Sequence, residues 1–120
     1  MRHVIREKKP SDSRRNMPDT YETQPSIAQW AADTFGVSTQ LRAATRMNEE
    51  VAELLAKMSN ATASQDKIIE EVADIQIVLY VLASRLHIDL DAEVQKKMAV
   101  NRARKWKLDG SGCGQHVEGE

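Results

Sequence analysis

Cysteine, proline and glycine are scarce or unevenly placed in this chain of 120 residues, and the absence of each from most of the chain excludes a structural feature. The single cysteine, Cys113, excludes an internal disulfide and fits a reducing compartment. No glycine or proline occurs between residues 37 and 109, so this stretch lacks the residues that usually interrupt helices. The sequence therefore predicts an all-α fold.

Long apolar runs and an excess of one charge are also missing. The longest apolar run, residues 75–83, is interrupted by Gln76 and is too short to span a bilayer. The N-terminus has no apolar stretch of the signal-peptide kind. With 17 basic and 18 acidic residues, the formal charge of −1 gives no global field toward nucleic acid or membrane. We expect a cytoplasmic protein whose partners include neither membrane nor nucleic acid.

Prolines and glycines mark the two ends of the chain. All three prolines lie in the first 25 residues, and four of the five glycines follow residue 109. This distribution predicts an extended or disordered arm over residues 1–25, a helical domain over 26–109 and an irregular tail over 110–120. Ser26 is expected to cap the first helix and Gly36 to end it. Four helices are expected, over about 26–35, 39–58, 64–86 and 90–107.

The third expected helix has apolar residues on more than one face. Its β-branched run, residues 75–81, would also suit a buried strand. The uninterrupted apolar stripe and the lack of turn residues favour a helix. A helix buried on several sides needs more cover than three short partners supply, so we expect self-association through a helical face.

Two clusters of acids carry the strongest chemical signal. Glu49, Glu50 and Glu53 lie in the second expected helix, and Glu71 and Asp74 follow after seventeen intervening residues. Acids three apart on a helix point the same way. If the two helices pack side by side, all of these except Glu49 converge, and their charge needs protons or cations. An all-oxygen site suits a hard divalent ion, so we expect Mg²⁺, with Mn²⁺ as an alternative.

The same acids also fit a simpler interpretation, in which they are surface glutamates paired with nearby cations. Lys57, Lys67 and Arg46 are available for such pairs. However, the acids border the apolar stripes instead of lying opposite them. Acids in that position are partly buried, and unpaired buried charge is costly. The pattern favours a functional site.

The fourth expected helix supplies basic groups. Lys97, Asn101 and Arg104 follow one line along it, at steps of four and three, and Lys105 flanks that line. Ammonium and guanidinium groups opposite a metal ion are what a polyphosphate needs. The alternative is a solvated basic helix end, which the helix dipole favours.

Two further residues are candidates for base recognition. Trp30 offers a face on which any base can stack, although a tryptophan in a small bundle usually belongs to the core. Asn48, beside the acids, can hydrogen-bond a sugar or a base, or it can be an exposed polar residue.

Taken together, these residues resemble the MazG-like, all-α nucleoside triphosphate pyrophosphohydrolases. The resemblance covers about residues 26–106 and rests on the motif Glu49-Glu50-x-x-Glu53, on Glu71-x-x-Asp74 and on the Lys–Asn–Arg series of the next helix. It implies a four-helix MazG-like bundle that assembles as a dimer or tetramer. It also implies hydrolysis of (deoxy)nucleoside triphosphates to the monophosphate and pyrophosphate, using Mg²⁺.

The resemblance also assigns roles to individual residues. The implied metal ligands are Glu50, Glu53, Glu71 and Asp74. The implied phosphate-binding residues are Lys97, Asn101, Arg104 and Lys105. Either Glu49 or Glu53 would orient or deprotonate the attacking water.

Two other classes of protein are alternatives to a pyrophosphohydrolase. A di-iron carboxylate bundle also uses glutamates on paired helices, but it needs Glu-x-x-His motifs, and no histidine here stands three residues after a glutamate. A non-catalytic helical interaction module, associated with nucleic acid through its basic arm and fourth helix, predicts exposed acids and no metal dependence.

Overall fold

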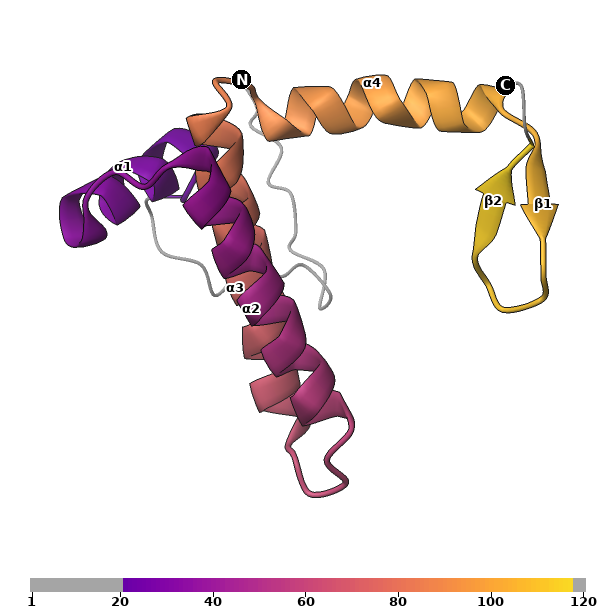
Figure 1. Cartoon of the computed structure of the whole chain (residues 1–120), viewed down its shortest axis with the longest axis horizontal. Helices are drawn as coiled ribbons and strands as arrows, with labels where there is room; N and C mark the ends of the chain where they lie inside the picture. Colours follow the sequence, from indigo (N-terminus) through magenta and orange to yellow (C-terminus); the bar gives the residue numbers. More distant parts are fainter. Residues whose placement is uncertain (1–20, 118–120) are drawn as a thin grey trace, which may run out of the picture.

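The computed structural model describes residues 21–117, which form four helices and one short hairpin (Figure 1). The elements are α1 (Gln24–Phe35), α2 (Gln40–Met58), α3 (Gln65–Arg85), α4 (Leu90–Ala103), β1 (Trp106–Leu108) and β2 (Gly114–His116). The predicted all-α fold class is confirmed, and residues 75–81 are helical. Within this part of the chain, no helix combines the length and the apolar character needed to cross a membrane.

Each helix begins where a polar side chain can accept a backbone hydrogen bond. The N-cap residues are Thr23, Thr39, Ser64 and Asp89. Each of them accepts from the backbone N–H three residues further on, which satisfies a donor that the helix itself leaves unpaired. Ser26, the predicted first cap, is instead the third residue of α1 and closes a capping box with Thr23. Gly36 ends α1 at a φ of 85°, as expected.

The C-terminal part differs from the prediction. Helix α4 ends at Ala103, short of residue 107, and residues 106–116 form an antiparallel hairpin in which Trp106 pairs with His116. The predicted irregular tail is therefore wrong for Gly114–His116, which form β2, whereas residues 110–113 form the turn between the strands. The glycines that suggested a tail make the turn possible, because Gly110 and Gly112 have φ values of 86° and 92°. The predicted arm lies outside the described residues except for 21–25.

The helices are arranged as an open arch. Helices α2 and α3 pack side by side along their lengths, and α1 packs against α3 (Figure 1). Helix α4 touches α3 only near the corner between them and then leads away, with the hairpin at its far end (Figure 1). The radius of gyration is 18.6 Å, whereas a compact chain of this length would have about 13 Å.

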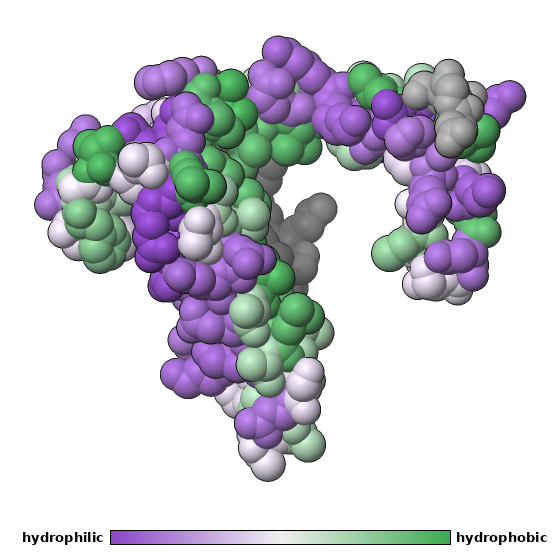
Figure 2. Space-filling view, viewed as in Figure 1, coloured by the Kyte–Doolittle hydropathy of each residue, from purple (hydrophilic) through white to green (hydrophobic). Residues whose placement is uncertain are grey.

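An open protomer of this kind leaves much apolar surface uncovered. Among the described residues, the only buried apolar ones are Ala31, Ala43 and Ala83. Large apolar side chains such as Leu55 and Ile69 are more than half exposed. Figure 2 shows hydrophobic residues at the surface along the helical pair and at the corner between α3 and α4. The sequence predicted apolar stripes along these helices, and within residues 21–117 of one chain they stay partly uncovered.

One side chain fixes the corner from which α4 departs. Gln24, the first residue of α1, donates from Nε2 to the carbonyl of Ile88 (2.7 Å) and accepts at Oε1 from the backbone N–H of Leu90 (2.9 Å). These two backbone groups flank the start of α4, next to His87 with its left-handed φ of 59°. The amide of Gln24 therefore ties the direction of α4 to α1.

We expect Gln24→Ala to lower the free energy of unfolding by about 1–3 kcal/mol, because it removes the side-chain partner of the Ile88 carbonyl and of the partly buried N–H of Leu90. Urea unfolding at a fixed protein concentration measures this difference. The matched control is Gln29→Ala, which removes an exposed hydrogen bond to Asp33 on the same helix and should stay within about 0.5 kcal/mol of the wild type. Equal effects of the two changes would show that Gln24 does not fix the corner.

Candidate functional site

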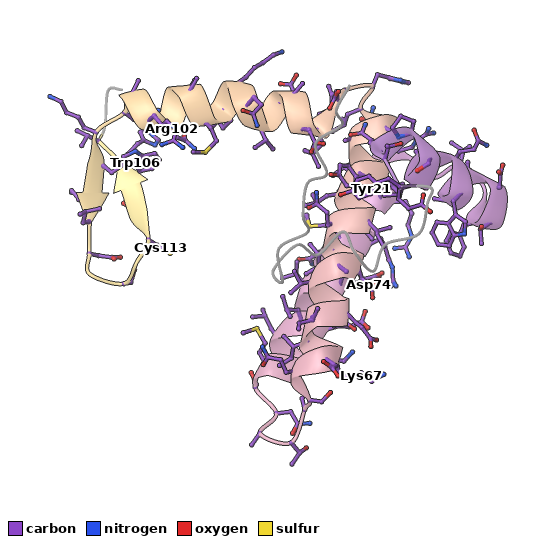
Figure 3. The ribbon with its side chains drawn as sticks, turned by 180° about the vertical axis from the view of Figure 1, so that it is seen from behind. Tyr21, Lys67, Asp74, Arg102, Trp106 and Cys113 are labelled. Atoms are coloured by element: carbon purple, nitrogen blue, oxygen red, sulfur yellow. The ribbon has the colours of Figure 1, made fainter. Side chains whose placement is uncertain are left out.

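Helices α2 and α3 bring three carboxylates together in the middle of the helical pair. One oxygen each from Glu50, Glu71 and Asp74 lies within 4.8 Å of the other two. Glu50 and Glu71 are buried, with only 4 % and 5 % of their surfaces exposed, whereas Asp74 is exposed (Figure 3). The packing of α2 on α3 thus brings Glu50 to two acids that lie 21 and 24 residues further along the sequence.

Glu53 lies beside this group without being part of it. It is exposed, one helical turn after Glu50, and close enough for its charge to help raise the pKa of Glu50. No ion pair to Glu53 occurs within residues 21–117. The structure therefore groups three of the four predicted metal ligands, with the fourth at the edge.

Burial and mutual repulsion act on the protonation of the cluster. The pKa of the Glu50 carboxyl is raised, first by burial and then by the negative charges of Glu53, Asp74 and Glu71. Arg46 acts in the opposite direction, because its Nη2 lies 2.5 Å from Glu50 Oε1. The group thus carries more negative charge than its own cations neutralise, and it favours an additional cation.

Lys57 pairs with the second buried acid, Glu71, through only one of its two carboxylate oxygens. Its Nζ donates to Glu71 Oε1 at 2.5 Å, and this bond raises the pKa of the Lys57 ammonium. The other oxygen, Glu71 Oε2, is buried and has no hydrogen-bond partner in the described structure. A buried carboxylate oxygen without a partner is costly, and a bound cation would satisfy it.

These donors fit a hard divalent metal ion. The three grouped side chains offer only oxygen atoms, which suits Mg²⁺ or Mn²⁺, and Glu71 Oε2 is an open ligand position. No histidine or cysteine belongs to the group. The residues present therefore satisfy the expectation of a magnesium-type site drawn from the sequence.

A pocket of about 660 Å³ adjoins the carboxylates. Its lining includes the acids Glu50 and Asp74 and the basic residues Arg42 and Arg46. Trp30 and Phe35 of α1 form an aromatic wall, with ring centroids 5.4 Å apart in an edge-to-face arrangement. Trp30 is half exposed, so it is not a core residue of this protomer. The pocket thus joins acids, guanidinium groups and an aromatic surface, the three features that a metal-bound nucleotide needs.

The remaining candidates on α2 lie outside this pocket. Glu49 is exposed and pairs with Arg46 (3.3 Å) and Arg42 (3.4 Å), and hydrogen bonds from these two cations lower the pKa of its carboxyl. Asn48 is exposed and does not line the pocket. A carboxylate held by two guanidinium groups is a weak base, so Glu49 is less suited than Glu53 to take a proton from water.

The predicted phosphate-binding residues are not brought to the carboxylates by this chain. Lys97, Asn101, Arg104 and Lys105 lie on α4 and just after it, and none of them lines the pocket. Figure 3 places Arg102, at the end of α4, far along the arm from Asp74. Their role in phosphate binding stays a prediction.

The cations that do reach the acids were underestimated from the sequence. Arg46 and Lys57 were considered only as partners in ordinary surface pairs, and Arg42 and Phe35 were not singled out. A usable signal existed for Arg46, because it precedes Glu50 by one helical turn and so shares its face. For Phe35, no sequence signal distinguishes a pocket wall from an exposed helix end.

Comparison with known proteins gives consistent results. The model of the MazG-like family matches residues 32–114. A dATP/dGTP diphosphohydrolase of Cyanophage S-2L is 32 % identical over 104 residues, which cover 86 % of this chain and 93 % of that protein. A dATP/dGTP diphosphohydrolase of Salmonella phage PMBT28 is 35 % identical over 97 residues, or 80 % of this chain, but this match covers only 31 % of that longer protein.

A solved structure extends the similarity to the fold. It is the Cyanophage S-2L MazG-like pyrophosphohydrolase bound to dGDP and three catalytic Mn²⁺ ions per active site. The two structures superpose with a TM-score of 0.66 at 30 % sequence identity, covering 81 % of this chain and 91 % of the other.

Proposed function

The chain belongs to the MazG-like family, and from this premise we propose that it hydrolyses deoxynucleoside triphosphates to the monophosphate and pyrophosphate with a divalent metal ion. The observation that carries the proposal is the meeting of Glu50, Glu71 and Asp74 beside a pocket with an aromatic wall. Since two relatives are dATP/dGTP diphosphohydrolases, dATP and dGTP are the first substrates to test.

The carboxylate group is the part of the site that would hold the metal. Glu50, Glu71 and Asp74 supply the ligands, and Glu53 stands at the edge of the same group. A bound Mg²⁺ or Mn²⁺ supplies positive charge for the phosphate oxygens and lowers the pKa of water. Glu53 has no cation partner in the described residues, so it is the better placed of the two predicted bases to accept the proton.

The pocket would hold the rest of the nucleotide. Trp30 and Phe35 offer the apolar face on which a base can stack. Arg42 and Arg46 line the same pocket, where guanidinium groups can meet phosphate oxygens. Asn48 lies outside the pocket, so a contact from it to sugar or base would require movement of the substrate or of α2.

We further propose that two or four copies assemble and that α4 of one copy serves the site of another. Helix α4 and its hairpin extend away from the helical pair, and the apolar stripes of the protomer are uncovered. Docking α4 of a second copy against α2 and α3 would cover apolar surface. It would also bring the α4 cations to the carboxylates, and these cations are Lys97, Arg104 and Lys105, with the amide of Asn101.

The activity is tested by following pyrophosphate release from each of the common deoxynucleoside and ribonucleoside triphosphates, with Mg²⁺ or Mn²⁺. We expect monophosphate and pyrophosphate as products. Excess EDTA should lower the rate at least about 100-fold, because the metal supplies both charge and the activated water. Re-adding the metal should restore the rate, which excludes irreversible damage. Turnover that survives EDTA, or release of inorganic phosphate with a diphosphate product, would refute the proposed reaction.

A further inference from the structure

Arg46 forms an ion pair with Glu50, the most buried of the proposed metal ligands. Its Nη2 lies 2.5 Å from Oε1 of Glu50, whose side chain is 5 % exposed, while half of the Arg46 side chain is in contact with solvent. The guanidinium therefore bridges the buried cluster and the open pocket, which it also lines. The Arg46 side chain can leave Glu50 without unpacking the helices, because half of it is already in contact with solvent.

The two cations paired with the cluster, Lys57 and Arg46, differ in their access to the pocket. Lys57 binds one oxygen of Glu71, and the other oxygen stays buried and without a partner, so a metal ion and Lys57 can share Glu71. Arg46 likewise binds one oxygen of Glu50, but its side chain is 50 % exposed against 37 % for Lys57, and of the two cations only Arg46 lines the pocket. A divalent ion placed among these acids would lie within a few ångströms of the guanidinium, and the two positive charges would repel each other.

We propose that Arg46 is an exchangeable counter-ion: it neutralises Glu50 before the metal binds, leaves Glu50 when the metal arrives, and then binds the triphosphate in the pocket. This inference rests on the proposed metal site and assigns a further phosphate-binding residue to it. The exchange keeps a cation on Glu50 in both states. It also delivers a guanidinium to the pocket at the point where metal binding prepares the site for the nucleotide.

The proposal predicts that one substitution has opposite effects on two ligands. With Arg46→Gln, Mn²⁺ alone should bind about tenfold more tightly, because a competitor is gone, a coupling in the usual range between two ligands of one protein. The same variant should bind a non-hydrolysable α,β-methylene analogue of dATP, in the presence of saturating Mn²⁺, about tenfold more weakly. Free Mn²⁺ measured by electron paramagnetic resonance gives the first affinity, and calorimetry gives the second.

Two further variants separate exchange from a general charge effect. Lys67→Gln removes one exposed cation, paired at 3.8 Å with Glu70 next to the cluster, and should leave the Mn²⁺ affinity within about twofold of the wild type. Arg46→Lys keeps a cation at the position and should also bind Mn²⁺ nearly as the wild type does. If Arg46→Gln does not fold, Arg46→Lys still tests the proposal, because it should lower the affinity for the nucleotide analogue and leave the affinity for Mn²⁺ unchanged.

The outcomes distinguish this inference from the function on which it rests. If wild-type protein binds no Mn²⁺, the proposed metal site itself is wrong. If the wild type binds Mn²⁺ but Arg46→Gln binds it equally or more weakly, the exchange is refuted. Tighter Mn²⁺ binding together with unchanged analogue affinity also refutes it, since the guanidinium then has no role at the phosphates.

Discussion

Asp74→Asn is expected to lower kcat/KM for the preferred nucleotide by roughly 100- to 1,000-fold, the usual effect of removing one group that stabilises transition-state charge. Asp74 is exposed and makes no ion pair in the described residues, so its substitution breaks no ion pair within residues 21–117. The amide keeps the shape of the side chain and removes its charge. The measurement is pyrophosphate release over a range of Mn²⁺ concentrations.

The matched control is Glu70→Gln on the same helix. Glu70 neighbours Glu71 but is exposed, and within residues 21–117 its one ion pair is with Lys67 at 3.8 Å, so its substitution should change kcat/KM by less than about twofold. Both variants should unfold at the wild-type temperature without metal, and only Asp74→Asn should lose stabilisation by Mn²⁺. Full activity in a folded Asp74→Asn protein would show that the cluster of Glu50, Glu71 and Asp74 does not act in catalysis as proposed.

The second large effect concerns α4, whose predicted phosphate-binding residues lie away from the acids of their own chain. We expect Lys97→Ala to lower kcat/KM about 100-fold when it is the only change, because it removes a cation that would stabilise the charge of the departing pyrophosphate. When Lys97→Ala and Asp74→Asn chains are combined in one dimer, about half of the wild-type activity should return, since one of the two symmetric sites is intact.

The experiment needs assemblies that contain both chains. Co-expression with two different affinity tags, followed by purification through both, selects mixed oligomers. The same procedure with two differently tagged Asp74→Asn chains is the control and should give no recovery. If Lys97 instead acts within its own chain, every site in the mixed dimer is defective, and activity stays at the level of the single variants. That result would refute completion of the site by a second copy.

The helical architecture was well predicted because its signals are local. The lack of glycine and proline between residues 37 and 109 leaves helix as the favoured state, and hydroxyl or carboxylate caps begin each helix. The errors occurred where a local signal has two meanings. Ser26 has the chemistry of a cap and serves as the capping-box residue, and Gly110 and Gly112 permit a hairpin turn as readily as an irregular tail.

The acids could be found because helix periodicity converts spacing into direction. Glu50 and Glu53 share one side of α2, and Glu71 and Asp74 share one side of α3, as the three-residue spacing requires. Their cations could not be chosen in the same way. Many basic residues have helical spacing to some acid, and only the packing of α2 on α3 places Lys57 against Glu71.

The sequence alone determined the positions of the four helices, apart from the C-terminal end of α4, and which acids share a helix face, because both follow from backbone preferences within a few residues. Tertiary packing decided the rest: which three acids meet, which oxygen of Glu71 is left without a partner, and that Trp30 faces a pocket and not a core. It also decided that α4 leads away from the acids, since the corner depends on the contact of Gln24 with a segment 64 to 66 residues away. Such distances between side chains depend on the angles between helices, and no local pattern encodes those angles.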